Sequence, residues 1–202
     1  MKKLPRKFYT RSTLRVAKEL LGNYLIVKIG RKKLTGKIVE TEAYVGPNDK
    51  ASHAYLPPRL RKFPGEGKIT CRNKTEYLEG GYIYIYLCYG MYWQFNITTA
   101  KEGKPECVLI RALEPSIKQK KQDANTQKLA NGPGKLCRWM RLDKSFDGED
   151  LTKSKRIWVA QELKIKRGQI AAAKRIGTDY AKEWAKKPWR FYIKNNPFIS
   201  KK

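Results

Sequence analysis

The sequence has little histidine and no closely spaced cysteines. Among 202 residues there is one histidine, His53, and the four cysteines are Cys71, Cys88, Cys107 and Cys137. Zinc sites and zinc deaminase centres need several Cys or His ligands at short spacings such as C-x-x-C. The scarcity of such ligands argues against a metal site, and we expect neither a metal nor a cofactor. The cysteines are expected to be free thiols in a reducing compartment.

Long apolar segments are also absent. No stretch approaches the ~20 apolar residues of a transmembrane helix. The N-terminal segment "MKKLPRKFYT" is basic but lacks the apolar region of a signal peptide. We therefore expect no membrane association. The expected location is the cytoplasm, on the nucleoid, in a bacterium or archaeon, and the nucleus in a eukaryote.

Acidic residues are few compared with basic ones. Lys and Arg total 45 against 18 for Asp and Glu, which gives a formal net charge of +27. Such an imbalance destabilises a compact chain by self-repulsion, so it indicates a polyanionic partner. An anionic membrane surface is one alternative, but no long amphipathic basic helix is evident. Nucleic acid is therefore the leading partner.

The length and the absence of repeats or a linker predict one domain over residues 1–202. Apolar spacing and turn residues predict the following elements. Helices are expected over 10–21 and 168–177, a loop leading into a short helix over 131–140, a mobile helix or loop over 116–130, a long irregular loop over 45–71, a hairpin over 82–97, and strands over 23–29, 34–44, 107–113 and 189–194. We expect an α+β fold: a single mixed domain with a largely antiparallel curved sheet, surrounding helices and a protruding β-hairpin.

The hairpin segment "YIYIYLCYGMYWQFN" is unusually rich in tyrosine. If Gly90 is the centre of a three-residue turn, Tyr84 lies opposite Asn96, and one face of the hairpin is apolar. The other face carries tyrosine rings next to amides, which suits stacking and hydrogen bonding. The first two tyrosines are also typical of any half-exposed strand. Tyr89 lies at the tip, where an aromatic ring contributes little to folding but can wedge between DNA base steps.

Carboxylates lie on a predicted strand of this basic chain. The segment "KIVETEAY" places Glu40, Glu42 and Tyr44 on one side of the strand. Negative groups near phosphates weaken DNA binding, so carboxylates at a binding face indicate chemistry, with charge balance as the alternative. A metal-dependent nuclease that uses both carboxylates and Lys37 is a further hypothesis. A single histidine is usually structural, so His53 alone indicates no role.

A series of short blocks occurs in order along the chain. They are "IVETEAYVGPND", "SHA", "YGMYWQFN", "VLIRALEP", "NGPGKLC", "KSFDGEDL" and "EWAKKPWRFY". Each block alone is weak evidence for a family. The ordered set, however, resembles the alkyladenine (3-methyladenine) DNA glycosylase family over nearly the whole chain. The resemblance implies a monofunctional enzyme of base excision repair. Acting as a monomer on double-stranded DNA, it would flip a damaged purine (3-methyladenine, 7-methylguanine or hypoxanthine) and hydrolyse its N-glycosidic bond, leaving an abasic site.

The resemblance also implies the catalytic residues. Glu42 matches the general base that activates a water to attack C1′ of the deoxyribose. Its carboxylate would also stabilise the positive charge that develops on the sugar. Arg111 matches a residue that holds Glu42 and the water, and Ile176 matches a position whose backbone carbonyl holds the same water.

The base pocket is implied in the same way. Tyr44, His53 and Tyr86 match the side chains that enclose the flipped base, and stacking of this kind contributes ~1–3 kcal/mol per base. His53 would in addition make a polar contact to the base edge. Asn96 matches the residue that excludes the 2-amino group of guanine.

Outside the pocket, Tyr89 matches the residue that intercalates where the nucleotide is extruded. Lys135 follows "NGPG", whose spacing is not that of a Walker A loop, and is a candidate contact to the DNA backbone. Two features depart from the family pattern. The segment 54–71 looks extended, and Glu76 occupies the place of a second, apolar groove-contacting residue.

Two further functions are compatible with these residues. A non-catalytic DNA- or RNA-binding module would have the same charge and the same tyrosines, but Glu42 and Asn96 would be replaceable without loss. A glycosylase with lyase activity would form a Schiff base through a lysine, and borohydride would trap its adduct with DNA. We expect no such adduct.

Overall fold

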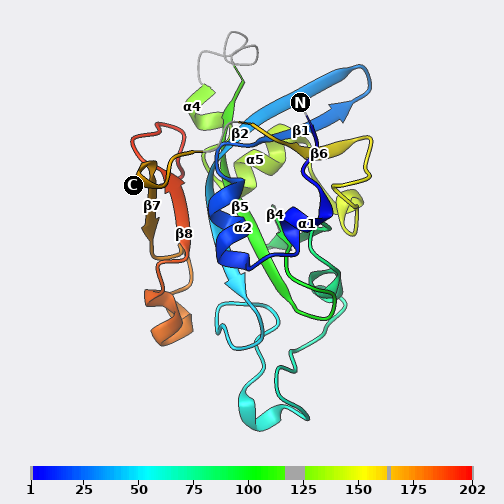
Figure 1. Ribbon diagram of the computed structural model, residues 1–202, viewed down its shortest axis with the longest axis vertical. Coiled ribbons are helices and arrows are strands. Elements are labelled where there is room, and N and C mark those ends of the chain that lie inside the picture. Colours follow the sequence, from blue (N-terminus) through cyan, green and yellow to red (C-terminus); the bar gives the residue numbers. More distant parts are fainter. Residues whose placement is uncertain (1, 117–125, 163–164, 202) are drawn as a thin grey trace.

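The structure, a computed structural model, describes residues 2–116, 126–162 and 165–201, and its ribbon is shown in Figure 1. The α-helices are α1 Arg6–Tyr9, α2 Thr13–Leu20, α4 Thr126–Leu129 and α5 Pro133–Met140. Short 3₁₀ helices are η1 Pro58–Leu60, η2 Lys74–Tyr77, η3 Lys144–Phe146, η4 Arg167–Gln169 and η5 Asp179–Lys186. The strands are β1 Tyr24–Ile29, β2 Lys32–Val45, β3 Ile83–Cys88, β4 Tyr92–Thr98, β5 Glu106–Pro115, β6 Ile157–Ala160, β7 Ile170–Ala173 and β8 Arg190–Ile193. In these three ranges no helix is long and apolar enough to cross a membrane.

The described strands form one antiparallel sheet. Its main order is β3-β4-β5-β2-β1-β6, and β8 pairs with β2 and carries β7 on its other edge. The β3–β4 hairpin has the predicted register, with Tyr84 opposite Asn96 and a turn centred on Gly90. The side chain of Tyr89 at the tip is 88% exposed. The predicted α+β fold built on an antiparallel sheet is therefore confirmed.

The longest strand, β2, bends where its neighbours change. One edge pairs with β5, while the other pairs first with β1 and then, over Glu40–Glu42, with β8. The pairing with β5 shifts register between Ile38 and Glu40 and again between Glu40 and Thr41. Such bulges bend a strand and redirect its side chains, and they are common beside active sites. The bulge gives the sheet curvature next to Glu42.

One face of the sheet packs against helices. α2 contacts β2, β5 and β8, and α5 contacts β4 and β5. Side chains from both helices and from alternate strand positions form the main core, which includes Val16, Leu20, Ile38, Ile85, Phe95, Ile110, Leu136 and Met140. Because successive strand residues point to opposite faces, the residues between these apolar positions face the other side of the sheet. Glu42, Tyr44, Tyr86, Asn96 and Arg111 lie there.

Some predicted elements differ from the structure. The helix expected over 10–21 is α2 alone, and Ser12 occupies its N-cap position without a side-chain capping bond. The helix expected over 168–177 is wrong, because Ile170–Ala173 form strand β7. Its alanine run favours a helix locally, but pairing with β8 supplies the backbone hydrogen bonds instead. Most of the polar segment 116–130 lies outside the described residues, and its end forms α4.

Candidate active site

Glu42 is enclosed by hydrogen-bond donors. Its side chain is fully buried on β2. Oε1 accepts a hydrogen bond from the backbone N–H of Ile176 at 2.7 Å. Oε2 accepts one from the Tyr44 hydroxyl at 3.0 Å and lies 3.3 Å from Nη1 of Arg111. Burial raises the pKa of Glu42, and Arg111, the Ile176 N–H and the Tyr44 hydroxyl oppose that rise. The three groups thus hold one carboxyl in a fixed orientation.

Glu40 is equally buried but serves as an anchor. Its carboxylate accepts hydrogen bonds from Nη1 of Arg190 at 2.9 Å and from the backbone N–H and hydroxyl of Ser200 at 2.6 and 2.9 Å. Nε of Arg111 lies 3.4 Å away. Arg111 therefore bridges Glu40 and Glu42, as expected for two carboxylates on one side of β2. Lys37, the third member of the nuclease hypothesis, instead has its Nζ 4.0 Å from the carboxylate of Glu114.

A second buried ion pair positions Ile176. Arg175 and Asp49 form a two-point salt bridge, with Nη2 and Oδ1 2.8 Å apart, and both side chains are inaccessible. Nη1 of Arg175 also donates to the carbonyl oxygen of Ala43, and the guanidinium lies over the Tyr44 ring at 4.8 Å. This network fixes the position of the backbone just before Ile176. It also fixes the ring of Tyr44, which forms one wall of the site. Sequence reasoning missed it, although "GPND" and "KRIG" contain both partners.

Next to Glu42, on the same face of the sheet, lies a pocket. Eight side chains line it: Tyr44, Ala51, His53, Glu76, Tyr84, Tyr86, Asn96 and Cys107. Its free volume is about 20 Å³, which is room for a water molecule but not for a purine. The pocket is also open to solvent on one side, so a base would extend beyond this enclosed part. Tyr44 belongs both to this pocket and to the donor set around Glu42, so the two sites are contiguous.

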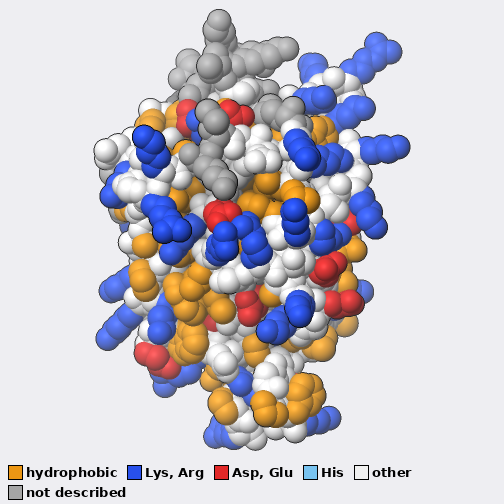
Figure 2. All heavy atoms as spheres, in the orientation of Figure 1, with side chains coloured by type: hydrophobic (Ala, Val, Ile, Leu, Met, Phe, Trp, Pro, Cys, Tyr) orange, Lys and Arg blue, Asp and Glu red, His pale blue; other side chains and the backbone are white. Residues whose placement is uncertain are grey.

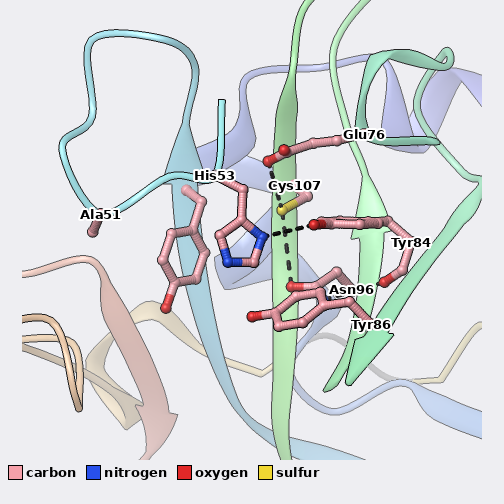
Figure 3. Close-up of a pocket in the computed structure, with 8 residues that line it drawn as sticks. Ala51, His53, Glu76, Tyr84, Tyr86, Asn96 and Cys107 are labelled. Atoms are coloured by element: carbon pink, nitrogen blue, oxygen red, sulfur yellow. Dashed lines mark hydrogen bonds between the residues drawn. The ribbon is translucent and has the colours of Figure 1, made fainter. Parts of the chain in front are cut away.

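The aromatic wall of the pocket is centred on His53 (Figure 3). Its ring packs edge-on against Tyr86, with centroids 4.5 Å apart, and Nδ1 lies 2.7 Å from the Tyr84 hydroxyl. Burial of the inner part of the ring, with the positive charge of Arg72, lowers the pKa of His53 to about 4. His53 is therefore neutral at physiological pH, even though part of its ring reaches the surface.

The polar wall contains Asn96, Cys107 and Glu76. The Asn96 amide nitrogen donates to the carbonyl oxygens of Tyr84 and Gln94 at 3.2 and 3.1 Å. The Cys107 thiol lies 3.8 Å from Oδ1 of Asn96 and 3.4 Å from Oε1 of Glu76. These contacts fix the Asn96 amide, with its oxygen toward the thiol.

Two pocket residues differ from the sequence-based interpretation. The strand pattern predicts a half-exposed Tyr84, but Tyr84 is 1% exposed and hydrogen-bonded to His53. Glu76, expected at a groove-contacting position, is also 1% exposed and lines the pocket. The alternation along the hairpin already placed Tyr84 on the face of Tyr86. Nothing in the sequence placed Glu76, because η2 reaches β3 and β5 only through the tertiary fold.

The remaining predicted residues lie at the surface. Tyr89 has a left-handed backbone, with φ +51°, followed by Gly90 at φ +72°. Such a conformation is uncommon for a tyrosine and marks a site worth a functional explanation. Lys135 is exposed, and its Nζ donates to Asn131 at 3.0 Å. The adjacent Gly134 packs so closely on Tyr92 that a Cβ there would lie 2.9 Å from the ring. Lys135 is therefore next to the hairpin.

Comparison with known proteins identifies the family. A sequence model of the family described as methylpurine-DNA glycosylase matches residues 7–197. Three relatives share the name "Putative 3-methyladenine DNA glycosylase": one from Legionella pneumophila (strain Corby), 45% identical over all of both chains; one from Natranaerobius thermophilus, 42% identical over 98% of each; and one from Methanocella arvoryzae, 42% identical over 98% of this chain and 96% of the relative. The chain belongs to the methylpurine-DNA glycosylase family. It is a DNA glycosylase of base excision repair, a hydrolase that acts on N-glycosyl bonds.

The burial of Glu76 predicts an unusual dependence of stability on pH. Burial, with the negative charge of Asp49 adding to it, raises the pKa of Glu76 to about 8. Between the ordinary Glu value of ~4.3 and about 8, the native state holds a proton that the unfolded chain has lost, so the free energy of unfolding falls as pH rises. Glu76→Gln cannot titrate. Its stability relative to wild type should increase by up to about 1.4 kcal/mol per pH unit in this window.

Urea unfolding of both proteins at pH 5.5 and pH 8 measures this difference. Titration of all other groups cancels in the comparison, because both proteins share them. A stability difference that stays constant between the two pH values would contradict the raised pKa.

Proposed function

We propose that this protein hydrolyses the N-glycosidic bond of 3-methyladenine, 7-methylguanine and hypoxanthine nucleotides in double-stranded DNA, using Glu42 to activate water. The observation that carries the proposal is a buried carboxyl, held by Arg111, Tyr44 and the Ile176 N–H, at the edge of an aromatic pocket. The family membership supplies the reaction class, and the local chemistry supplies the roles of the residues.

In the proposed mechanism a damaged nucleotide is flipped out of the duplex and its base enters the pocket. The sugar then lies toward Glu42, beyond the ring of Tyr44. As the C1′–N bond breaks, positive charge develops on the sugar, and the carboxylate stabilises it in a site that excludes water. Glu42 takes a proton from the attacking water, and a pKa raised by burial makes it a stronger base. The displaced base leaves without a covalent enzyme intermediate.

Arg111 and Ile176 act by positioning. Arg111 neutralises part of the charge of both Glu40 and Glu42, so the two carboxylates can lie on the same face. Ile176 contacts Glu42 through its N–H, and its carbonyl, implied by the resemblance to hold the water, remains part of the proposal. The Asp49–Arg175 pair holds Ile176 in place.

The pocket accounts for recognition of the base. Tyr44 on one side, with His53 and Tyr86 on the other, provides aromatic surfaces that stack on any purine and attract a cationic one. Asn96, fixed by two backbone carbonyls, would crowd the 2-amino group of guanine. 7-Methylguanine keeps this group, so its release depends on the weaker N-glycosidic bond of a cationic base. A rigid obstruction of this kind discriminates by exclusion.

The direct test is release of free base. Duplexes that contain one hypoxanthine or one 7-methylguanine are incubated with excess enzyme and EDTA, and the released base is separated and quantified. We expect release of both bases in the chelator and no protein–DNA adduct with borohydride, because none of the eight pocket side chains is a lysine. Absence of release would contradict the proposal, and activity that EDTA abolishes would favour a metal-dependent reaction.

Tyr89 should control base flipping. Its exposed ring at the strained hairpin tip can fill the stack that the extruded nucleotide leaves, and extrusion otherwise costs a few kcal/mol. Tyr89→Ala should therefore weaken binding and slow excision of a stably paired lesion by about 10-fold or more. The loss should be smaller for a lesion opposite a mismatch. Tyr89→Phe, which keeps the ring, is the matched control and should resemble wild type.

Single-turnover excision and equilibrium binding on paired and mismatched duplexes measure this effect. Equal losses of affinity and rate on both duplexes would mean that Tyr89 contributes contact area alone.

We propose further that the enzyme acts as a monomer, since the hairpin and the pocket described here come from one chain. Sedimentation of the free protein and of its complex with one duplex tests this.

A further inference from the structure

The carboxyl of Glu76 is buried at the wall of the base pocket. It is 1% exposed and lines the base pocket. Its Oε1 lies 3.4 Å from the Cys107 thiol, and its Oε2 has no hydrogen-bond partner among the described residues. In the described part of the chain Glu76 forms no ion pair. This is unusual in a sequence with 45 Lys and Arg residues.

A buried polar group without a partner is rare and needs an explanation. An apolar side chain of similar size would fill the same space without leaving an oxygen unpaired. In Figure 3 the carboxyl of Glu76 is directed at the Cys107 thiol, and the hydroxyl of Tyr84 is directed at the ring of His53. Glu76 therefore borders the space that a ligand would enter.

The other charges around the pocket are already compensated. Asp49 is paired with Arg175, and Glu42 with Arg111. His53 is neutral, and burial raises the pKa of the Cys107 thiol well above its usual value, so the thiol is neutral too. Among the described groups lining the pocket, Glu76 is thus the carboxyl available to a cationic ligand.

We propose that Glu76 is a specificity-determining residue that selects purines carrying a positive charge over neutral purines, by placing a carboxylate beside the flipped base. The proposal rests on the function proposed above. Alkylation at N3 or N7 gives the purine ring of a nucleotide a formal positive charge, whereas hypoxanthine is neutral. A carboxylate in a desolvated site attracts the cationic base by Coulomb interaction, whereas it gives neutral hypoxanthine no comparable binding energy.

The protonation of Glu76 makes this selection depend on pH. In the empty pocket burial raises its pKa to about 8, so the acid form prevails at neutral pH. The loop before η1 contributes Asp49, which raises this pKa, and the neutral His53. β5 contributes Cys107, and β3 contributes Tyr84 and Tyr86. The thiol of Cys107 and the side chains of Ser52 and Asn73 partly oppose the rise.

When a cationic base enters, Glu76 releases its proton to solvent and the carboxylate pairs with the cation. Affinity for the cationic lesion should therefore increase from about pH 6 to pH 8 and then level off. During bond cleavage the positive charge moves from the base to the sugar. Glu76 consequently favours the bound complex over the transition state, so its loss should weaken binding and should not lower the excision rate constant at saturation.

The test measures binding without turnover. Duplexes carry either 7-methylguanine or hypoxanthine on a 2′-fluoro sugar, whose electron-withdrawing fluorine opposes the positive charge needed for cleavage. Fluorescence anisotropy gives the dissociation constants of wild type, Glu76→Gln and Glu76→Met. Glu102→Gln is the matched control, because it removes the same charge from an exposed position.

We expect Glu76→Gln and Glu76→Met to weaken binding of the 7-methylguanine duplex by about 10- to 100-fold. Binding of the hypoxanthine duplex should be unchanged, and Glu102→Gln should alter neither. The ratio between wild type and Glu76→Gln on the 7-methylguanine duplex should grow as pH rises from 6, for as long as the methylated base keeps its positive charge.

Equal losses on the two lesions, or no loss on either, would overturn the proposal. Unfolding of both Glu76 variants, seen by circular dichroism, would overturn it as well, because the role would then be structural. Failure of the proposed function has a different signature, since wild type would release no base from duplexes with ordinary sugars. The binding comparison with the fluorinated duplexes still decides the role of Glu76 in that case.

Discussion

Replacement of Glu42 by Gln should abolish base release while leaving the fold and the binding of damaged DNA intact. The amide keeps the shape of the side chain and can still contact Tyr44 and Arg111. It cannot take a proton from water, and loss of a general base costs ~10²–10⁴-fold in rate. Loss of the negative charge beside the developing cation adds to this, because a preorganised charge in a buried site contributes strongly to the transition state.

Single-turnover excision of hypoxanthine and of 7-methylguanine measures the effect, with Glu102→Gln as the exposed control. The neutral lesion should be affected at least as strongly, because its base is the poorer leaving group. In wild type the rate should fall as pH decreases through the pKa of Glu42, which burial places above its ordinary value. Excision by Glu42→Gln within a few-fold of wild type would refute the assignment and favour the non-catalytic binding module.

Binding to DNA should decrease steeply as salt concentration rises. The chain carries a net charge of +27, and Lys and Arg side chains outnumber Asp and Glu over the face shown in Figure 2. Basic side chains also lie close to the pocket. Arg72 is 4.9 Å from the Tyr86 ring centroid, Lys135 lies next to the hairpin, and the exposed Lys182 is in η5, whose Tyr180 reaches Ala51.

Each phosphate that these groups contact releases condensed counterions, so the logarithm of the binding constant falls linearly with the logarithm of salt concentration. For ~6–10 phosphates the slope should be about −5 to −9, which is a loss of about 10³- to 10⁵-fold between 50 and 200 mM salt. Titrations of an undamaged duplex at several salt concentrations give the slope. Arg72→Gln and Lys135→Gln should each reduce it by about one unit. A flat dependence would contradict a phosphate-contacting surface.

The hairpin shows how much of the structure a local sequence pattern can predict. Alternation of apolar residues with tyrosines, closed by a short turn at Gly90, was enough to predict the register that places Tyr84 opposite Asn96. The side chains of a strand alternate with a fixed period, so the turn alone determines which residues share a face. The same rule placed Glu40 and Glu42 together, and Arg111 is in contact with both.

Local pattern was wrong where distant segments supply the hydrogen bonds. Residues 170–173 have the composition of a helix, but they form β7 because β8 presents an unpaired edge to them. Asp49 and Arg175 are 126 positions apart, and neither has a local signal for the other. A buried ion pair of this kind exists only when the fold removes both groups from water together.

The sequence by itself therefore determined the basic, DNA-directed character of the chain, the strand that bears Glu42 and the two faces of the hairpin. Each of these follows from composition or from a short periodic pattern. The tertiary structure alone decided that Tyr84 is buried against His53, that Arg175 and Asp49 hold the segment around Ile176, and that Glu76 enters the base pocket. These depend on the packing of η2 and of the loop before η1 against β3 and β5, because burial of a polar group is a property of its neighbours and not of its own segment.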